Sequence, residues 1–178
     1  MSVRRQTQVS EGEYLATMTG VKPSLEFVNG KVIQKPLTKR SHAEVSKRLA
    51  AIFFAYERSN GGYFAWETTT NLSEGPDRRY RVPDLAYWAP GKPVGDEIFL
   101  PPTLAIEVVS EGQTLKDMRD KCAEYLSRGV EVCWLIDPRR RIAEILSAGA
   151  APISVRSGAV LVAPPFPGLA VPFDDLFA

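Results

Sequence analysis

The sequence predicts an α/β fold in which a mixed central β-sheet is flanked by helices and preceded by an N-terminal β-hairpin. Three features support this fold class. Segments with helical spacing of apolar residues alternate with short strand-like runs. The runs 85–88 and 104–109 are largely apolar on both faces, as buried central strands are. Asn29-Gly30 stands between two apolar runs and indicates a hairpin, because a type I′ turn needs positive φ at both positions.

The length and composition fit a single domain over residues 1–178, which is large enough to fold without a disulfide or a metal. We divide it into an N-terminal helix and hairpin (1–40), a core (41–146) and a proline-rich C-terminal extension (147–178). Twenty-two basic and 21 acidic side chains leave a net charge of +1. This balance excludes a histone-like protein, an acidic tail protein and a disordered polyelectrolyte.

The two cysteines, Cys122 and Cys133, have no companion ligands and exclude a structural zinc site. We expect two buried free thiols in a reducing cytosol, with a disulfide between them as the alternative. No apolar core follows the arginines of residues 1–6, and the longest uncharged run, 157–173, contains four prolines. We therefore expect a cytoplasmic protein without a membrane partner.

Three helices are predicted from their caps. Capping boxes at 10–13 and 41–44 indicate a short helix over 11–18 and a helix of about 16 residues that stops before Asn60. A third cap at Thr114 opens a helix that ends near Arg128-Gly129. Besides the hairpin at 25–33, the predicted strands are 63–70, 80–88, 104–109, 131–137 and 141–146, with short β-like pieces in the tail.

The sequence argues against two common kinds of active site. No glycine-rich loop precedes a helix, so a P-loop or dinucleotide-binding fold is not expected. A nucleophile–histidine arrangement would need His42, the only histidine. His42 falls on the same helical face as Val45 and Leu49, which predicts a capping or core histidine rather than a catalytic one.

Two carboxylates stand out because they lie in apolar strands. Glu107 is the only charged residue of 104–109, and Asp84 follows Pro83 at the start of another apolar run. The alternatives are a solvent-facing strand end for Glu107 and an ordinary turn for Pro83-Asp84. Two buried carboxylates about 4 Å apart would repel each other by ~4 kcal/mol at an effective dielectric constant of ~20. A divalent metal between them would remove that cost.

Lys121 is the candidate cation for this pair. On a helical wheel it lies roughly 40° outside the apolar arc of residues 115–126. A lysine at the margin of a buried face can send its ammonium inward. The alternative is a surface ion pair with Asp117 at i,i+4 spacing.

The segments that carry these residues resemble the Uma-two family of putative restriction endonucleases, within the PD-(D/E)XK nuclease superfamily. They are the Pro83-Asp84 strand, the Leu-Ala-Ile-Glu-Val-Val-Ser strand at 104–110, and segments 117–125 and 129–138. The resemblance extends from the Glu-Phe-Val-Asn-Gly run at 26–30 to Leu-Phe at 176–177. It implies a restriction-endonuclease-like core and Mg²⁺-dependent (or Mn²⁺-dependent) hydrolysis of phosphodiester bonds.

The resemblance also implies roles for individual residues. Asp84 and Glu107 would be metal ligands, with the Val108 carbonyl as a third, and Lys121 would complete the catalytic set. The superfamily's usual lysine position, two residues after the glutamate, is Val109 here. The accessory candidates are His42, Glu44 and Tyr125. The candidates for contacts with the DNA backbone are Arg78, Arg79, Arg81, Lys39 and Arg40.

Two classes of function remain open at this point. The first is a metal-dependent DNA endonuclease, for which cutting both strands of a duplex favours a homodimer. The second is a non-catalytic nucleic-acid-binding or assembly protein that keeps the same fold, and a small-molecule hydrolase is a third alternative. We favour the nuclease, because a binding scaffold has no use for two carboxylates that repel phosphate.

Overall fold

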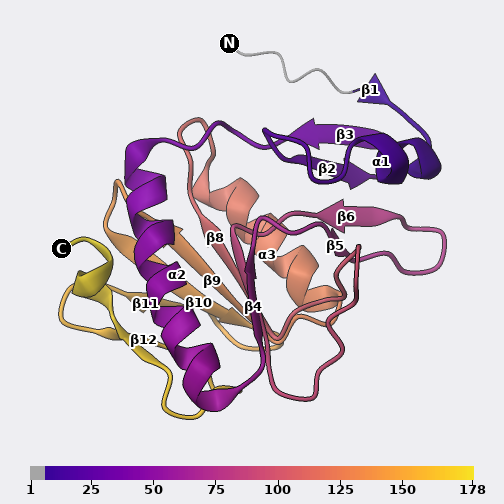
Figure 1. Cartoon of the computed structure of the whole chain (residues 1–178). Coiled ribbons are helices and arrows are strands. Elements are labelled where there is room, and N and C mark those ends of the chain that lie inside the picture. The colour runs from indigo at the N-terminus through magenta and orange to yellow at the C-terminus, as the bar shows by residue number, and fades with distance from the viewer. Residues whose placement is uncertain (1–6) are drawn as a thin grey trace.

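The computed structural model describes residues 7–178, and its centre is a six-stranded β-sheet (Figure 1). In order across the sheet, the strands are β11 (Ile153–Val155), β10 (Ile142–Ser147), β9 (Val132–Asp137), β8 (Leu104–Val108), β7 (Leu85–Trp88) and β4 (Tyr63–Trp66). Strands β8 and β9 run parallel, and the other neighbouring pairs of this sheet run antiparallel. Helix α3 (Leu115–Ser127) forms the crossover that the parallel pair requires. The predicted mixed sheet is confirmed.

The alternation of side chains along β8 explains how both faces of the sheet are covered. Ile106 packs in a buried cluster with Phe53 of helix α2 (Arg40–Asn60), on one face. Ala105 points the other way and packs with Met118 and Tyr125 of α3. The α2 face also receives the C-terminal segments, which are β12 (Val160–Val162), β13 (Ala170–Pro172) and the 3₁₀ helix η1 (Phe173–Leu176).

A second, smaller sheet carries the N-terminal hairpin. Its strands, in order, are β1 (Thr7–Gln8), β3 (Lys31–Gln34), β2 (Leu25–Val28), β6 (Arg79–Arg81) and β5 (Thr70–Asn71). Asn29 and Gly30 have φ of 47° and 85°, which confirms the predicted turn between β2 and β3. Helix α1 (Glu11–Thr17) covers this sheet and packs Tyr14 against Phe27 and Tyr80.

One predicted helix start is wrong. Helix α2 begins at Arg40, its N-cap Lys39 provides no side-chain hydrogen bond, and Ser41 lies inside the first turn. The predicted capping box at 41–44 therefore does not form, and the helix spans 21 residues, to Asn60. The caps predicted elsewhere do form, because Ser10 and Thr114 each accept a hydrogen bond from the backbone N–H three residues later.

Two predicted strands are each divided between the two sheets. The segment 63–70 breaks at Glu67, whose φ is 48°, so that β4 joins the main sheet and β5 the smaller one. The segment 80–88 breaks at 82–84, where Pro83 has no N–H to donate, and separates β6 from β7. Asp84 therefore lies where the chain passes from the smaller sheet into the main one.

The remaining expectations concern the cysteines and the termini. Cys122 and Cys133 are buried free thiols whose sulfur atoms lie 2.8 Å apart, as the preferred interpretation predicts. In the described part of the chain, no helix has the length and apolar character to cross a bilayer. Residues 1–6, on which the expectation about a signal segment depends, lie outside the described residues.

Candidate active site

Asp84, which directly precedes β7, lies beside Glu107 of the neighbouring strand β8. The antiparallel register pairs Leu85 with Ile106, so the next position along brings residue 84 opposite residue 107. The backbone N–H of Val108 donates to Asp84 Oδ2 at 2.7 Å. Both carboxylates are buried, with 5% of Asp84 and 1% of Glu107 exposed. The structure therefore brings together the two acids that the sequence singles out.

Two side chains from outside the main sheet, those of Lys35 and His42, contact the Asp84 carboxylate. Lys35, which directly follows β3, places Nζ 2.6 Å from Oδ1. His42, in the first turn of α2, places Nε2 3.1 Å from Oδ2. Burial on its own would raise the pKa of Asp84, but the Lys35 ammonium and the hydrogen bond from His42 outweigh it and hold the pKa well below its usual range. Asp84 is therefore an anion at neutral pH.

Glu107 shares one oxygen between two donors on α3. Lys121 Nζ lies 2.7 Å from Glu107 Oε1, and the Tyr125 hydroxyl donates to the same oxygen at 2.8 Å. Burial raises the pKa of Glu107, and the nearby lysines offset this only in part. Burial and Glu107 raise the pKa of Tyr125 well above its usual value, so its hydroxyl stays protonated and continues to donate.

Glu26, on β2, is a third buried acid of this site that the sequence analysis did not single out. Its Oε1 lies 2.7 Å from Lys121 Nζ and accepts the Val82 N–H at 3.0 Å, while its Oε2 accepts from Arg81 at 2.9 Å. Burial would raise the pKa of Glu26, but Lys121 and Arg81 lower it to about 2. Glu26 is the only charged residue of an apolar strand, which is the same signal that identified Glu107.

Lys121 thus bridges two carboxylates from different sheets. Its side chain is 11% exposed. Burial would lower the pKa of Lys121, but Glu107 and Glu26 raise it above its usual value. The sequence predicts Lys121 as the cation for both Asp84 and Glu107. In the structure, Lys121 contacts Glu107 and Glu26, and the lysine that contacts Asp84 is Lys35. The alternative of a surface pair with Asp117 does not form.

The arginines expected at the DNA backbone have partners within the chain. Arg81 is 13% exposed and lies between Glu26 and Glu124. Arg79 pairs with Asp77 and Glu124, and Arg78 pairs with Glu11. Of the three, Arg78 has the most exposed side chain, at 46%. Their contact with DNA stays a prediction, and the structure leaves Arg78 in the best position to make it.

The accessory candidates His42 and Glu44, and the basic residues Lys39 and Arg40, lie in different places. His42 is buried, as predicted for a core histidine, yet its ring contacts Asp84. Glu44 pairs with Lys47 and lines a separate cavity beside the C-terminal tail, so the structure does not bring it to this site. Lys39 and Arg40 are exposed at the start of α2, where Lys39 pairs with Glu111.

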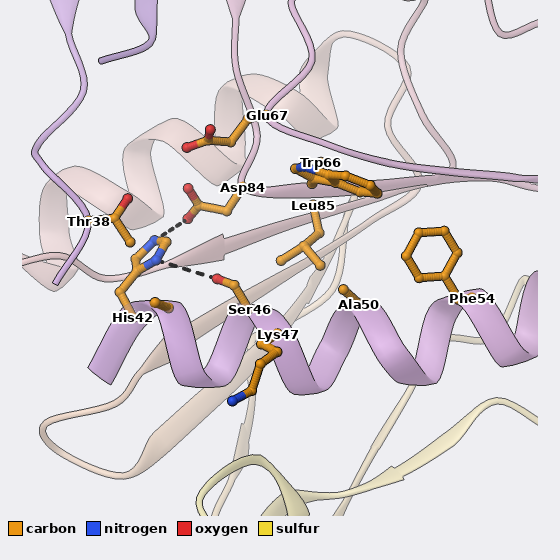
Figure 2. Close-up of a pocket in the computed structure, with 11 residues that line it drawn as sticks. Thr38, His42, Ser46, Lys47, Ala50, Phe54, Trp66, Glu67, Asp84 and Leu85 are labelled. Atoms are coloured by element: carbon orange, nitrogen blue, oxygen red, sulfur yellow. Dashed lines mark hydrogen bonds and ion pairs between the residues drawn. The ribbon is translucent and has the colours of Figure 1, made fainter. Parts of the chain in front are cut away.

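Two cavities open on this cluster. One, of about 290 Å³, is lined by charged side chains that include Glu26, Lys35 and Lys121. The other, of about 380 Å³, lies on the α2 side and includes His42 and Asp84 (Figure 2). Within residues 7–178, no group of three or more His, Cys, Asp or Glu side chains is arranged to hold a metal ion. A metal here would take its remaining ligands from backbone, water or substrate.

Comparisons with known proteins agree with this fold. A family model described as "Uma2: Putative restriction endonuclease" matches residues 12–174. No curated protein matches the chain. Among solved structures, the chain is similar to a "putative nuclease belonging to DUF820" from Anabaena variabilis, with 21% sequence identity, a TM-score of 0.83, and coverage of 95% of this chain and 97% of that chain. The structural match supports the predicted restriction-endonuclease-like α/β core. Because the family model matches most of its length, the chain belongs to the Uma2 family of putative restriction endonucleases.

Proposed function

We propose that this protein is a divalent-metal-dependent DNA endonuclease of the restriction type. The observation that carries the proposal is a pair of neighbouring buried carboxylates: Asp84 directly precedes β7, and Glu107 lies on β8 next to Val108, whose N–H donates to Asp84. Membership of a restriction endonuclease family supports a nuclease activity on DNA. Asp84, Glu107 and Lys121 would form the catalytic set, and Mg²⁺ or Mn²⁺ would be the metal.

The donor atoms at this site suit Mg²⁺. Mg²⁺ prefers oxygen ligands and commonly takes one or two carboxylates, with water and substrate phosphate completing the shell. The N–H of Val108 points to Asp84, and the N–H and C=O of one strand residue face the same neighbour. The Val108 carbonyl therefore faces the side on which Asp84 lies, which supports it as a third ligand.

The side chains around the pair would bind and orient rather than exchange protons. When bound, Mg²⁺ supplies a Lewis acid that activates water and offsets charge on the phosphate. Lys121, with its raised pKa, stays protonated and would act as a cation that stabilises charge developing on the substrate. The Tyr125 hydroxyl orients Glu107, and Lys35 with His42 orients Asp84.

One observation favours a second function, that of a non-catalytic nucleic-acid-binding or assembly protein. Each carboxylate already has a lysine of the same chain within 2.7 Å. A protein without catalytic turnover could keep these ion pairs simply to join its two sheets. Metal binding and cleavage separate the two candidates.

The decisive experiment incubates the protein with supercoiled, linear and single-stranded DNA in the presence of Mg²⁺, Mn²⁺ or EDTA. We expect cleavage only in the presence of metal. Glu107→Gln should lose it, and Glu131→Gln should keep it, because the Glu131 side chain is 53% exposed, pairs with Lys92 and lines neither cavity of the site. Calorimetric titration with Mg²⁺ should show binding heat that Glu107→Gln loses. DNA binding by the wild type without metal-dependent cleavage would contradict the nuclease and favour the second function. Sedimentation of the intact protein tests the expected homodimer.

A further inference from the structure

The cavity on the α2 side of Asp84 has a polar end and an aromatic end. Figure 2 shows Asp84, His42 and Thr38 together at one end, and the rings of Trp66 and Phe54 toward the other. Its volume of about 380 Å³ lies in the range typical of ligand pockets, which combine apolar walls with a few polar groups. The polar end is the proposed catalytic site, so the aromatic end is what requires explanation.

Both aromatic rings are unusually exposed. Trp66 is 56% exposed and Phe54 is 43% exposed, whereas the other two tryptophans, Trp88 and Trp134, are fully buried. The Trp66 and Phe54 rings lie 5.6 Å apart at 74° to each other, in an edge-to-face contact. They come from different elements, β4 and α2, and meet at this cavity. Their exposure therefore gathers apolar surface at one concave site.

The position of Trp66 relative to Asp84 is set by the sheet. Trp66 pairs with Leu85 across β4 and β7, and Leu85 directly follows Asp84. The N–H of Glu67 also donates to the Asp84 backbone carbonyl at 3.2 Å. The backbone of Trp66 is therefore fixed directly beside Leu85, the residue that follows Asp84. A nucleotide with its phosphate at Asp84 would have its own base, or an adjacent one, within reach of Trp66.

The chemistry of the aromatic end suits a nucleobase. Every base has a π-face that can stack on an aromatic side chain, independently of sequence. The Thr38 and Ser46 hydroxyls line the same cavity and can bond to base edges. Ser46 Oγ also lies 3.4 Å from His42 Nδ1, and the Glu67 carboxylate, which lines the cavity too, pairs with Lys22. A paired base in a duplex has both faces covered by its neighbours, so it can reach Trp66 only by leaving the stack.

We propose that this cavity is a base-binding pocket in which Trp66 and Phe54 receive one unpaired nucleobase of the DNA strand being cut. The inference rests on the proposed nuclease function and names its substrate class, which is DNA with an unpaired nucleotide at the cleavage site. Single strands, flaps and bubbles meet this requirement directly. A fully paired duplex meets it only after a base is extruded, at a cost in free energy.

Tryptophan fluorescence gives a test that does not depend on cleavage. Stacking on a base quenches an indole, and Trp66 is the exposed tryptophan of the three. The protein is titrated with an oligothymidine single strand and with a duplex of equal length, in Ca²⁺ without Mg²⁺. We expect the single strand to quench the emission and the duplex to quench it much less. Equal quenching by both, or none by either, would overturn the proposal.

Variants separate this pocket from the catalytic chemistry. By the usual effect of removing a stacking ring, Trp66→Ala should weaken single-strand binding by about 5- to 150-fold, with Trp66→Phe close to wild type. Tyr63→Leu is the matched control, because Tyr63 is 41% exposed on the same strand and points to its opposite face. Unchanged single-strand affinity in a folded Trp66→Ala would refute the pocket even if the wild type cleaves DNA. Base-dependent quenching without metal-dependent cleavage would instead refute the nuclease.

Discussion

Replacing Lys121 with methionine tests whether one ammonium compensates two buried carboxylates. The substitution keeps the length and apolar stem of the side chain and removes the charge that lies 2.7 Å from both Glu26 and Glu107. Removing one partner of a buried ion pair costs about 3–5 kcal/mol, because the other charge stays buried without compensation. At ~2–4 °C of Tm per kcal/mol for a chain of this length, Lys121→Met should lower Tm by about 6–20 °C near neutral pH.

The size of this loss should depend on pH in a defined direction. In the wild type, the pKa of Glu26 lies at about 2, below its usual 4.5, so its ionised form stabilises the fold above pH 4.5 and that contribution is lost as the pH falls toward 2. Burial already raises the pKa of Glu107, and loss of Lys121 raises it further. A raised carboxyl pKa means that protonation stabilises the folded state. The Tm deficit of Lys121→Met should therefore shrink as the pH falls from about 7 to about 5.

Thermal unfolding followed by circular dichroism, at several pH values and without metal, measures both effects. Lys116→Met is the matched control on the same helix. Its side chain is 81% exposed and pairs with Asp120 at the surface, where ion pairs contribute little to stability, so Tm should move by less than about 2 °C. Equal losses in the two variants, or a Lys121→Met deficit that stays constant with pH, would refute the bridging role of Lys121.

Asp84→Asn and Glu107→Gln should both abolish metal-dependent cleavage in a plasmid nicking assay, yet differ in thermal stability. Asp84→Asn leaves the buried Lys35 ammonium without its nearest carboxylate and should lower Tm. Glu107→Gln removes a carboxyl with a raised pKa and should hold or raise Tm. A lower Tm for Glu107→Gln than for Asp84→Asn would contradict these assignments. For DNA binding, Arg78→Ala should lower the slope of the logarithm of the binding constant against the logarithm of the salt concentration by about one. Arg81→Ala should lower Tm instead, because Glu26 and Glu124 both pair with the Arg81 side chain. An unchanged slope for Arg78→Ala would place the DNA path elsewhere.

The elements that the sequence predicts well are those with a local cause. The turn at Asn29-Gly30, the cap at Thr114 and the strand β8, which is apolar except for Glu107, each depend on a few adjacent residues. The division of 80–88 between two sheets has a distant cause. Strand β6 belongs to the smaller sheet rather than to the sheet of β7 because it pairs with β2, where Tyr80 is opposite Phe27. A local pattern of apolar residues does not carry that information.

The same distinction applies to the site. Asp84 and Glu107 could be found because an isolated charge in an apolar strand signals a buried acid, and Glu26 carries the same signal. Lys35 could not, because it follows a short strand and nothing in its neighbours shows that the hairpin folds over the main sheet. Its contact with Asp84 depends on how the two sheets meet, which only the three-dimensional structure shows.

Asp84 joins parts of the fold as well as serving as a candidate ligand. It receives Lys35 from the hairpin, His42 from α2 and the Val108 N–H from β8, so three separate elements meet at one carboxylate. Any substitution there disturbs the junction of the two sheets together with the chemistry. Among residues 7–178, the Glu107 side chain bonds to Lys121 and Tyr125, both on α3, and Lys121 keeps Glu26 as a partner when the Glu107 charge is removed. Loss of cleavage in Glu107→Gln therefore reports on the chemistry itself, whereas loss in Asp84→Asn also reports on the structure.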